Sequence, residues 1–361
     1  MNYFPDFPIH KKIQEQFINS LANNRLAHAY LFYGPEGCGK EAFSFELAKM
    51  LNCEDENNRP CNSCPACSKI GHLNHPDLKY IFPTGATWKP DEISKKISGK
   101  AQNPFSRIEL SGHTVIQIER IRELKNEAKY ASYEAKKRFY IVSEAEKMSR
   151  ESANSFLKLL EEPPENLIII LITSKQNTLL DTIRSRCRIV HFPVLSFEDA
   201  SLIVNKYCIL DEEIKKTIRM SQGNLKEFFD MIDKPIDEKR QLVYEYLKST
   251  ASGNALKLMT TVDAIAKKRD KNFLKEILNL LILWMKDSLY LVHFGKDSNI
   301  INVDFEEEIR KFAENYSLSN FDKIVTEIEN AVQNLNRNVY NPLILTVLAF
   351  KIKQNLVQKT I

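Results

Sequence analysis

The sequence predicts an α/β domain built on a parallel sheet with a phosphate-binding loop, followed by a small helical domain and a larger helical domain. Three observations predict it. Apolar strand-like segments alternate with helical patterns in the first half of the chain, as they do in a three-layer α/β domain. A glycine-rich loop that ends in lysine follows the first of these strand segments. Beyond Pro193, strand signals almost vanish and amphipathic helical patterns continue to the C-terminus.

Six short segments are predicted as strands. They are rich in aromatic and branched residues, which favour a pleated sheet. The apolar run 167–172 is continuous rather than alternating, which is typical of a strand buried on both faces of a parallel sheet. The six segments are 28–33, 77–82, 113–118, 138–142, 167–173 and 188–192.

Changes of pattern predict three domains: 1–195, 196–236 and 237–361. A Lys-Pro pair at 234–235 separates the small helical domain from long helices. One of these is expected over 272–294, with an apolar stripe that packs in the core or against sister subunits. The stripe consists of positions 273, 274, 277, 278, 281, 284 and 285.

Residues 84–112 are polar, and we expect them to form a surface insertion with one short helix. The role of the insertion stays open, and simple solvation is one interpretation of its basic side chains. These are Lys89, Lys95, Lys96, Lys100 and Arg107.

Composition indicates an ordinary soluble protein. The chain of 361 residues is 43% hydrophobic, and its net charge is +4 from 51 basic and 47 acidic residues. We attribute the small excess of base to solvated helix faces. The apolar run 280–285 is too short to span a bilayer, and the N-terminus lacks the pattern of a signal peptide. We therefore expect a cytoplasmic protein.

The segment 34–40 reads Gly-Pro-Glu-Gly-Cys-Gly-Lys and lies between a predicted strand and a predicted helix over 41–50. This is the context that a phosphate loop requires. Backbone N–H groups of such a loop surround a phosphate at the positive end of the helix. We predict a nucleotide site formed by Gly34, Gly37, Gly39 and Lys40, in which the lysine neutralises phosphate oxygens.

Two positions depart from the pattern that holds Mg²⁺. Glu41 follows the loop lysine, where the motif uses the hydroxyl of Ser or Thr. The strand 138–142 ends in Ser143-Glu144, where phosphate-loop enzymes place an Asp that ligates the metal. Glu144 can activate water, but Ser143 is a poor metal ligand and Glu41 repels phosphate. We predict a degenerate site with little or no ATP hydrolysis; whether nucleotide is retained stays open.

Four of the seven cysteines crowd into residues 53–67. In a reducing compartment such a crowd indicates metal rather than disulfides. Four thiolates at this spacing can close a tetrahedral zinc site that has no open catalytic position. The alternatives are an iron–sulfur cluster, whose usual run continues with a Cys-Pro that is absent here, and unmetalled thiols. The predicted ligands of a structural zinc insertion are Cys53, Cys61, Cys64 and Cys67.

Arg186 lies in Ser185-Arg186-Cys187, between the predicted strands 167–173 and 188–192. In a ring-forming ATPase of this architecture, that segment faces the next subunit. A guanidinium there can reach the neighbour's γ-phosphate and stabilise transition-state charge. The alternative is a surface ion pair.

Taken together, these motifs resemble the clamp-loader subunits of bacterial DNA polymerase III, an AAA+ family, and the delta-prime type more than gamma/tau. The departures at Glu41 and Ser143 favour delta-prime. The resemblance covers nearly the whole chain, and the Leu-Glu-Glu-Pro-Pro stretch and the cysteine insertion are its most specific parts. Its segments are 25–32, 34–40, 53–67, 75–77, 118–124, 152–164 and 185–187.

The resemblance implies a AAA+ module, a small helical lid and a helical collar that holds a pentamer together. It implies that Arg186 acts in trans on ATP bound by an adjacent gamma/tau subunit. Lys226 stands where active members carry a sensor arginine, and Thr173 or Ser174 matches the other sensor loosely. The implied partners are gamma/tau, delta, the sliding clamp and primer–template DNA, with no membrane. The polymerase activity of the holoenzyme resides in other subunits.

Two other functions fit parts of the sequence. A gamma-like active ATPase would hold its metal with Glu41 and Glu144. A zinc-containing DNA-binding adaptor outside any ring would need a concentrated basic or aromatic stretch, and the sequence contains none. We therefore favour a non-hydrolysing clamp-loader subunit.

Overall fold

The structure is a computed structural model, and it describes residues 2–85, 89–108, 114–232, 236–268, 270–295, 300–337 and 339–357. The chain forms two compact units, Met1–Asp230 and Met231–Ile361, and each is described by itself. The predicted break at 234–235 lies outside the described residues. The division into three domains stays a prediction.

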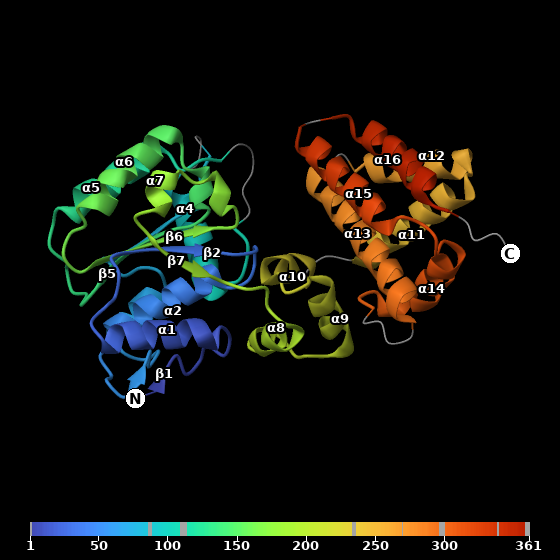
Figure 1. The fold of residues 1–361 in the computed structure, drawn as a ribbon. Coiled ribbons are helices and arrows are strands. Elements are labelled where there is room, and N and C mark those ends of the chain that lie inside the picture. Colours follow the sequence, from blue (N-terminus) through green and yellow to red (C-terminus); the bar gives the residue numbers. More distant parts are fainter. Residues whose placement is uncertain are drawn as a thin grey trace. The chain divides into compact units, whose positions relative to one another are not determined.

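Unit 1 contains a five-stranded parallel sheet (Figure 1). Its strand order is β4–β5–β6–β2–β7. The central strand β2 pairs with β6 on one side and β7 on the other, with Leu31 opposite Leu171 and Ile189. Strand order therefore reverses direction at β2, and ligand sites of open α/β sheets lie at such a point. The strands are β2 (Ala29–Tyr33), β4 (Leu78–Ile81), β5 (Arg138–Val142), β6 (Leu167–Thr173) and β7 (Arg188–His191).

The prediction of a strand over 113–118 is wrong for the described part of that segment. Val115 and Ile116 form isolated bridges with two different segments, through Thr84 and Met148 respectively. Among the described residues both bridges stay isolated, and helix α5 begins at Ile118. His113 lies outside the described residues.

Helices cover both faces of the sheet (Figure 1). Successive strand residues point to opposite faces, so Phe32 packs against Phe17 of α1 and Phe43 of α2, while Leu31 joins an aliphatic core with Phe156 of α6. The helices are α1 (Lys11–Ala22), α2 (Lys40–Asn52), α3 (Pro65–Gly71), α4 (Pro90–Gln102), α5 (Ile118–Ala128), α6 (Arg150–Glu161) and α7 (Asp181–Arg184). Two short strands, β1 (Asn2–Tyr3) and β3 (Asn58–Arg59), pair in parallel.

Three short helices complete unit 1, and we call them the lid helices. Side-chain caps begin two of them: Ser196 accepts a hydrogen bond from the backbone of Asp199, and Asp211 from that of Ile214. The lid helices are α8 (Phe197–Val204), α9 (Glu212–Met220) and α10 (Leu225–Ile232).

Unit 2 is helical in its described residues, with α13 packed against α11, α14 and α15. All seven apolar positions predicted for α13 are buried, so that prediction is confirmed. By length and composition alone, its segment Phe273–Phe294 could cross a membrane. However, 56% of the apolar stretch is buried inside the protein. The helices are α11 (Ile236–Ser252), α12 (Ala255–Ala266), α13 (Lys271–Phe294), α14 (Glu306–Asn315), α15 (Phe321–Asn336) and α16 (Asn341–Asn355).

Candidate functional site

The predicted phosphate loop connects β2 to the N-terminus of α2, as the sequence predicted. At Gly37 the backbone has φ +71°, and a Cβ would lie 1.8 Å from the side-chain oxygen of Asn224 in the lid. Glycine is therefore required both for conformation and for space. The backbone N–H of Leu225 also donates to the carbonyl of Gly37, at 3.1 Å. The lid thus rests directly on the loop.

Lys40 is turned back onto its own loop. Its ammonium donates to the carbonyl of Gly34 at 2.7 Å, and also to the carbonyl of Pro35 and the sulfur of Cys38. The side chain is 7% exposed, and burial lowers the pKa of Lys40. The N–H donors of the Lys40 ammonium are therefore engaged in hydrogen bonds within the loop itself.

Glu41 is the centre of a buried polar cluster. One carboxylate oxygen accepts hydrogen bonds from Ser143 at 2.5 Å and from Tyr80 at 2.8 Å. The other pairs with Lys100 at 2.6 Å and Lys226 at 3.0 Å. Burial alone would raise the pKa of Glu41, but the two lysines hold it well below its usual range. The residue is therefore an anion that the protein itself neutralises.

Two basic residues of 84–112 have specific partners, and one of them, Lys100, is not solvated. Lys100 is 1% exposed because α4 places its ammonium on Glu41. Arg107 bridges the phosphate loop and the lid, pairing with Glu36 at 2.6 Å and Asp230 at 2.8 Å. No local pattern marked either residue, since their partners are distant in sequence.

The residues at the end of β5 have separate roles. Ser143 is 2% exposed and directed at Glu41. Glu144 has φ +49° and pairs with Lys147 at 2.8 Å. A cavity of about 470 Å³ lies beside the loop and is lined by Glu144, Ser174 and Lys226 among others. The degenerate motif residues are thus together in space, around a cavity large enough for a small ligand.

The two predicted sensor positions differ in their contacts. Lys226 reaches Glu41 from α10. Burial alone would lower the pKa of Lys226, but Glu41 and Glu36 raise it. The Thr173 hydroxyl accepts the backbone N–H of Lys175 at 2.9 Å, so it caps the turn after β6.

Arg186 lies away from this cluster, on the turn between α7 and β7. Its guanidinium contacts Glu161 at 2.8 Å and the carbonyl of Thr182 at 2.9 Å. Its side chain is 37% exposed, whereas the neighbouring Cys187 is buried in the aliphatic core. The core residue fixes the turn, and the arginine faces solvent with an exchangeable surface partner.

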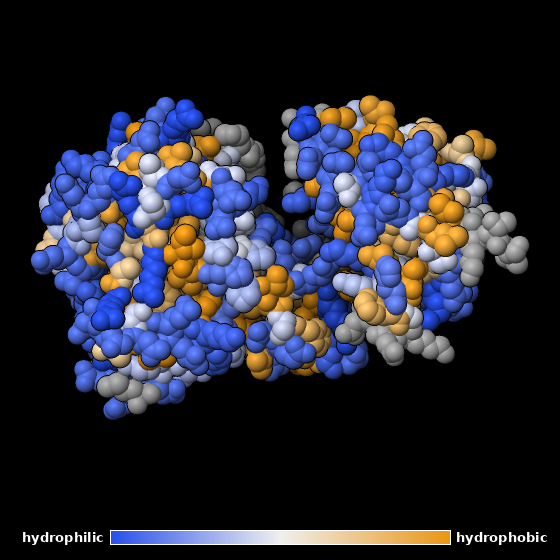
Figure 2. Space-filling model, viewed as in Figure 1, coloured by the Kyte–Doolittle hydropathy of each residue, from blue (hydrophilic) through white to orange (hydrophobic). Residues whose placement is uncertain are grey.

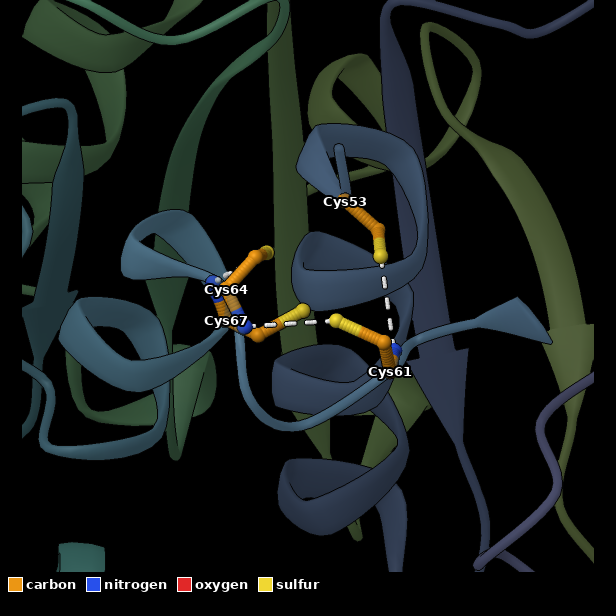
Figure 3. Close-up of side chains that lie close together, drawn as sticks. All are labelled: Cys53, Cys61, Cys64 and Cys67. Atoms are coloured by element: carbon orange, nitrogen blue, oxygen red, sulfur yellow. Dashed lines mark hydrogen bonds between the residues drawn. The ribbon is translucent and has the colours of Figure 1, made fainter. Parts of the chain in front are cut away.

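The four predicted metal ligands converge from α2, the segment after β3, and α3 (Figure 3). Their sulfur atoms all lie within 4.8 Å of one another. In a tetrahedral site with Zn–S bonds of about 2.3 Å, sulfur atoms lie roughly 3.8 Å apart, so small rotamer changes close such a site. Hydrogen bonds from Ser63 lower the pKa of Cys61 to about 6, whereas burial raises the pKa of Cys53 and of Cys67, so the fit to a metal rests on the positions of the four sulfur atoms. The cluster therefore fits a metal ion.

A second hollow, which we call the basic groove, lies between α5 and α6 and has a volume of about 450 Å³. Sequence reasoning missed it because its bases come from two helices. Arg122 and Lys158 form no ion pair with any part of the chain that the structure describes. The groove is lined by Arg122, Lys125, Asn126, Ala128, Lys129, Lys158, Leu159, Glu162 and Pro164.

Comparison with known proteins places the chain in a family. The family model described as DNA polymerase III, delta subunit, matches residues 9–196, and the model for the C terminal part of that subunit matches 236–354. The delta' subunit of Bacillus subtilis (strain 168) is 35% identical over 51% of this chain and 47% of its own length. The tau subunit of Escherichia coli (strain K12) is 30% identical over 62% of this chain and 32% of its own length.

A solved gamma subunit-related protein of DNA polymerase III from Thermotoga maritima is 16% identical, with 95% of this chain and 99% of that chain covered and a TM-score of 0.44. The matched part spans less than two thirds of the delta' and tau relatives. The two family models nevertheless match most of the described sequence. The chain therefore belongs to the DNA polymerase III delta subunit family.

Proposed function

We propose that the chain is a non-hydrolysing subunit of the DNA polymerase III clamp loader. It works in the cytoplasm with gamma/tau and delta subunits, completes a neighbour's ATP site with Arg186, and helps load the sliding clamp on primed DNA. The family match and the gamma and tau relatives support its place in a clamp loader. The observation that carries the non-hydrolysing role is the pairing of Glu41 with Ser143.

This pairing occupies the two positions that hold Mg²⁺ in active members. The hydroxyl of Ser143 donates to Glu41, and two lysines already neutralise that carboxylate. A magnesium ion would have to compete with both cations for the same oxygens. Phosphoryl transfer relies on the metal to neutralise charge on the phosphates, so this arrangement opposes turnover.

The proposed trans role of Arg186 rests on its exposure and its anchoring. The side chains of Ile183 and Cys187 are buried in the core and anchor the turn. The Arg186 guanidinium is therefore held at a defined place on the surface. Its pair with Glu161 is half-exposed, and such surface pairs contribute little free energy. Replacing Glu161 by a neighbour's phosphate as the partner of Arg186 would therefore cost little free energy.

Two surfaces support work in a DNA-bound assembly. We assign the basic groove to the phosphate backbone of DNA, because four cations surround one carboxylate there and backbone contacts dominate such binding. In unit 2, α16 carries exposed apolar residues at one-face spacing, and Figure 2 shows hydrophobic side chains scattered among hydrophilic ones on the visible face of this unit. We assign this face to collar packing. Its residues are Tyr340, Leu343, Val347 and Phe350.

We assign the four-cysteine cluster to a structural zinc ion. The four thiolates would hold the ion, which supplies charge neutralisation and a crosslink but no chemistry of its own. Cys53 caps the C-terminus of α2, while Cys64 and Cys67 belong to the N-terminal turn of α3. The ion would therefore fix α3 against the helix that begins at the phosphate loop.

The first experiment is nucleotide binding and turnover by the purified chain with Mg²⁺. We expect no turnover above the level of a Lys40→Ala variant. Robust turnover that is lost in Lys40→Ala would instead identify a gamma/tau-like motor subunit in which Glu41 and Glu144 hold the metal. That outcome would overturn the non-hydrolysing role while leaving the family assignment in place.

A further inference from the structure

The Glu41 carboxylate joins four elements that are far apart in the sequence. It is the second residue of α2, and its oxygens contact side chains of β4, α4 and α10 and of Ser143, the residue after β5. The first turn of a helix stabilises negative charge because its free N–H groups point there. In a phosphate loop that charge is normally the ligand's. Here a side chain of the loop's own helix supplies it.

The two metal-site positions show a reciprocal exchange of chemical groups. Phosphate-loop proteins place a hydroxyl after the loop lysine and a carboxylate at the end of the strand. This chain places the carboxylate at Glu41 and the hydroxyl at Ser143, and the two groups are hydrogen-bonded at 2.5 Å. The negative charge thus lies on the side that faces Lys100 and Lys226.

A second set of contacts fixes the same elements. Arg107 holds Glu36 of the loop and Asp230 of α10, and Leu225 donates its backbone N–H to Gly37. The lid helix α10 and the insertion helix α4 are therefore both tied to the loop by side chains of this chain. Tyr80, Ser143 and Lys100 are buried and the side chain of Lys226 is 13% exposed, so water screens these pairs weakly.

We propose that Glu41 is a built-in anion that closes α4 and α10 over the phosphate loop in place of nucleotide. The lid of this subunit is then closed at all times, independently of ATP. The proposal goes beyond the proposed function, which requires only that the chain does not hydrolyse ATP. A lid that needs no ligand suits a subunit that acts through a fixed exposed arginine.

The test is hydrogen exchange of the full chain, comparing wild type with Glu41→Gln. We expect backbone amides of 225–232 and 90–102 to exchange at least about tenfold faster in the variant, since exchange reports local opening, while β6 is unchanged. The matched control is Glu212→Gln, which breaks an exposed pair with Lys215 inside α9 of the same lid. Unchanged exchange in a folded Glu41→Gln protein overturns the proposal.

A second arm adds ATP and Mg²⁺ to the wild type. The built-in anion predicts no slowing of exchange in α10, whereas slowing would show that nucleotide closes the lid and would overturn the proposal. If Glu41→Gln does not fold because Lys100 and Lys226 are left without their partner, the variant Glu41→Gln/Lys100→Met/Lys226→Met removes the unpaired charges. It is expected to fold and to show the same faster exchange in α10.

A third arm reverses the exchange of groups with Glu41→Thr/Ser143→Asp. This variant restores the hydroxyl and carboxylate to their usual positions and frees Lys226 to meet phosphate. We expect calorimetry to show at least about tenfold tighter binding of ATP with Mg²⁺ than in wild type. A folded double variant without any gain overturns the built-in anion. None of these results depends on Arg186, so failure here is distinct from failure of the proposed trans role.

Discussion

The buried polar cluster around Glu41 and the turn that carries Arg186 differ in the sign and the exposure of their central charge. At Glu41, one anion is satisfied by two lysines, a serine and a tyrosine, and the carboxylate residue is 6% exposed. At Arg186, one cation lies at the surface with a single half-exposed acidic partner. In the first region, cations of the same chain already neutralise the carboxylate. In the second, the exposed ion pair contributes little free energy, so the arginine can exchange its partner at little cost.

This contrast shows two ways in which one fold places a charge: a buried anion held at the phosphate loop and an exposed cation on a surface turn. The cluster beside the phosphate loop also ties the lid and the insertion to the loop. The turn before β7 is anchored separately, through buried Ile183 and Cys187. We therefore expect changes in one region to leave the other intact, and four predictions test that separation.

The largest expected effect is at Arg186. In an assembled loader, Arg186→Ala should lower ATP turnover at the site that it completes by about 10³-fold, since transition-state charge on the γ-phosphate loses its guanidinium. The measurement is DNA-stimulated ATPase activity. Arg184→Ala is the matched control, because Arg184 pairs with Asp181 one turn away on α7. Equal activity of both variants would make Arg186 a surface ion pair only.

Metal removal is expected to have the next largest effect. Elemental analysis should find one zinc per chain, and Cys64→Ser should lower the free energy of unfolding by at least about 2 kcal/mol, because folding and metal binding are coupled. Urea unfolding measures the change, with Cys208→Ser as a control outside the cluster. Visible absorbance typical of iron–sulfur clusters, or a metal-free native protein, would contradict zinc.

Acid should weaken the buried polar cluster around Glu41 and leave the arginine turn in place. The pKa of Glu41 is lowered in the folded state, so its stabilising contribution is complete above the ordinary value of 4.5 and is lost as the pH falls below it. The free energy of unfolding should therefore fall more steeply on acidification in wild type than in Glu41→Gln. Parallel pH profiles of the two proteins would show that the carboxylate is not held as an anion.

The smallest expected effect concerns the basic groove. Lys158→Ala should weaken binding of primed DNA about threefold and reduce the salt slope of log K by about 0.9, as expected for one lost phosphate contact. Lys215→Ala, which removes an exposed lysine of the lid, is the control. Fluorescence anisotropy with labelled DNA provides the measurement. If an acidic peptide bound the groove as tightly as DNA, the assignment to DNA backbone would be wrong.

Much of the fold follows from local pattern. The apolar runs at Arg138–Val142 and Leu167–Thr173 have the predicted bounds, since a buried parallel strand leaves an uninterrupted hydrophobic signal. The phosphate loop and the core stripe of α13 are also predicted correctly. The segment 113–118 was not, because its bridges depend on partners that no local pattern reveals.

By itself, the sequence determined the candidate chemistry: a loop that lacks its hydroxyl, a strand end that lacks its carboxylate, four clustered thiols and an isolated arginine. Those features are short-range, and residue type and spacing are enough to state them. Only the tertiary structure decided what becomes of Glu41, since Lys100 lies 59 residues away and Lys226 further still. A charge that looks unfavourable beside a phosphate in the sequence becomes favourable once folding brings two cations to it in a buried site.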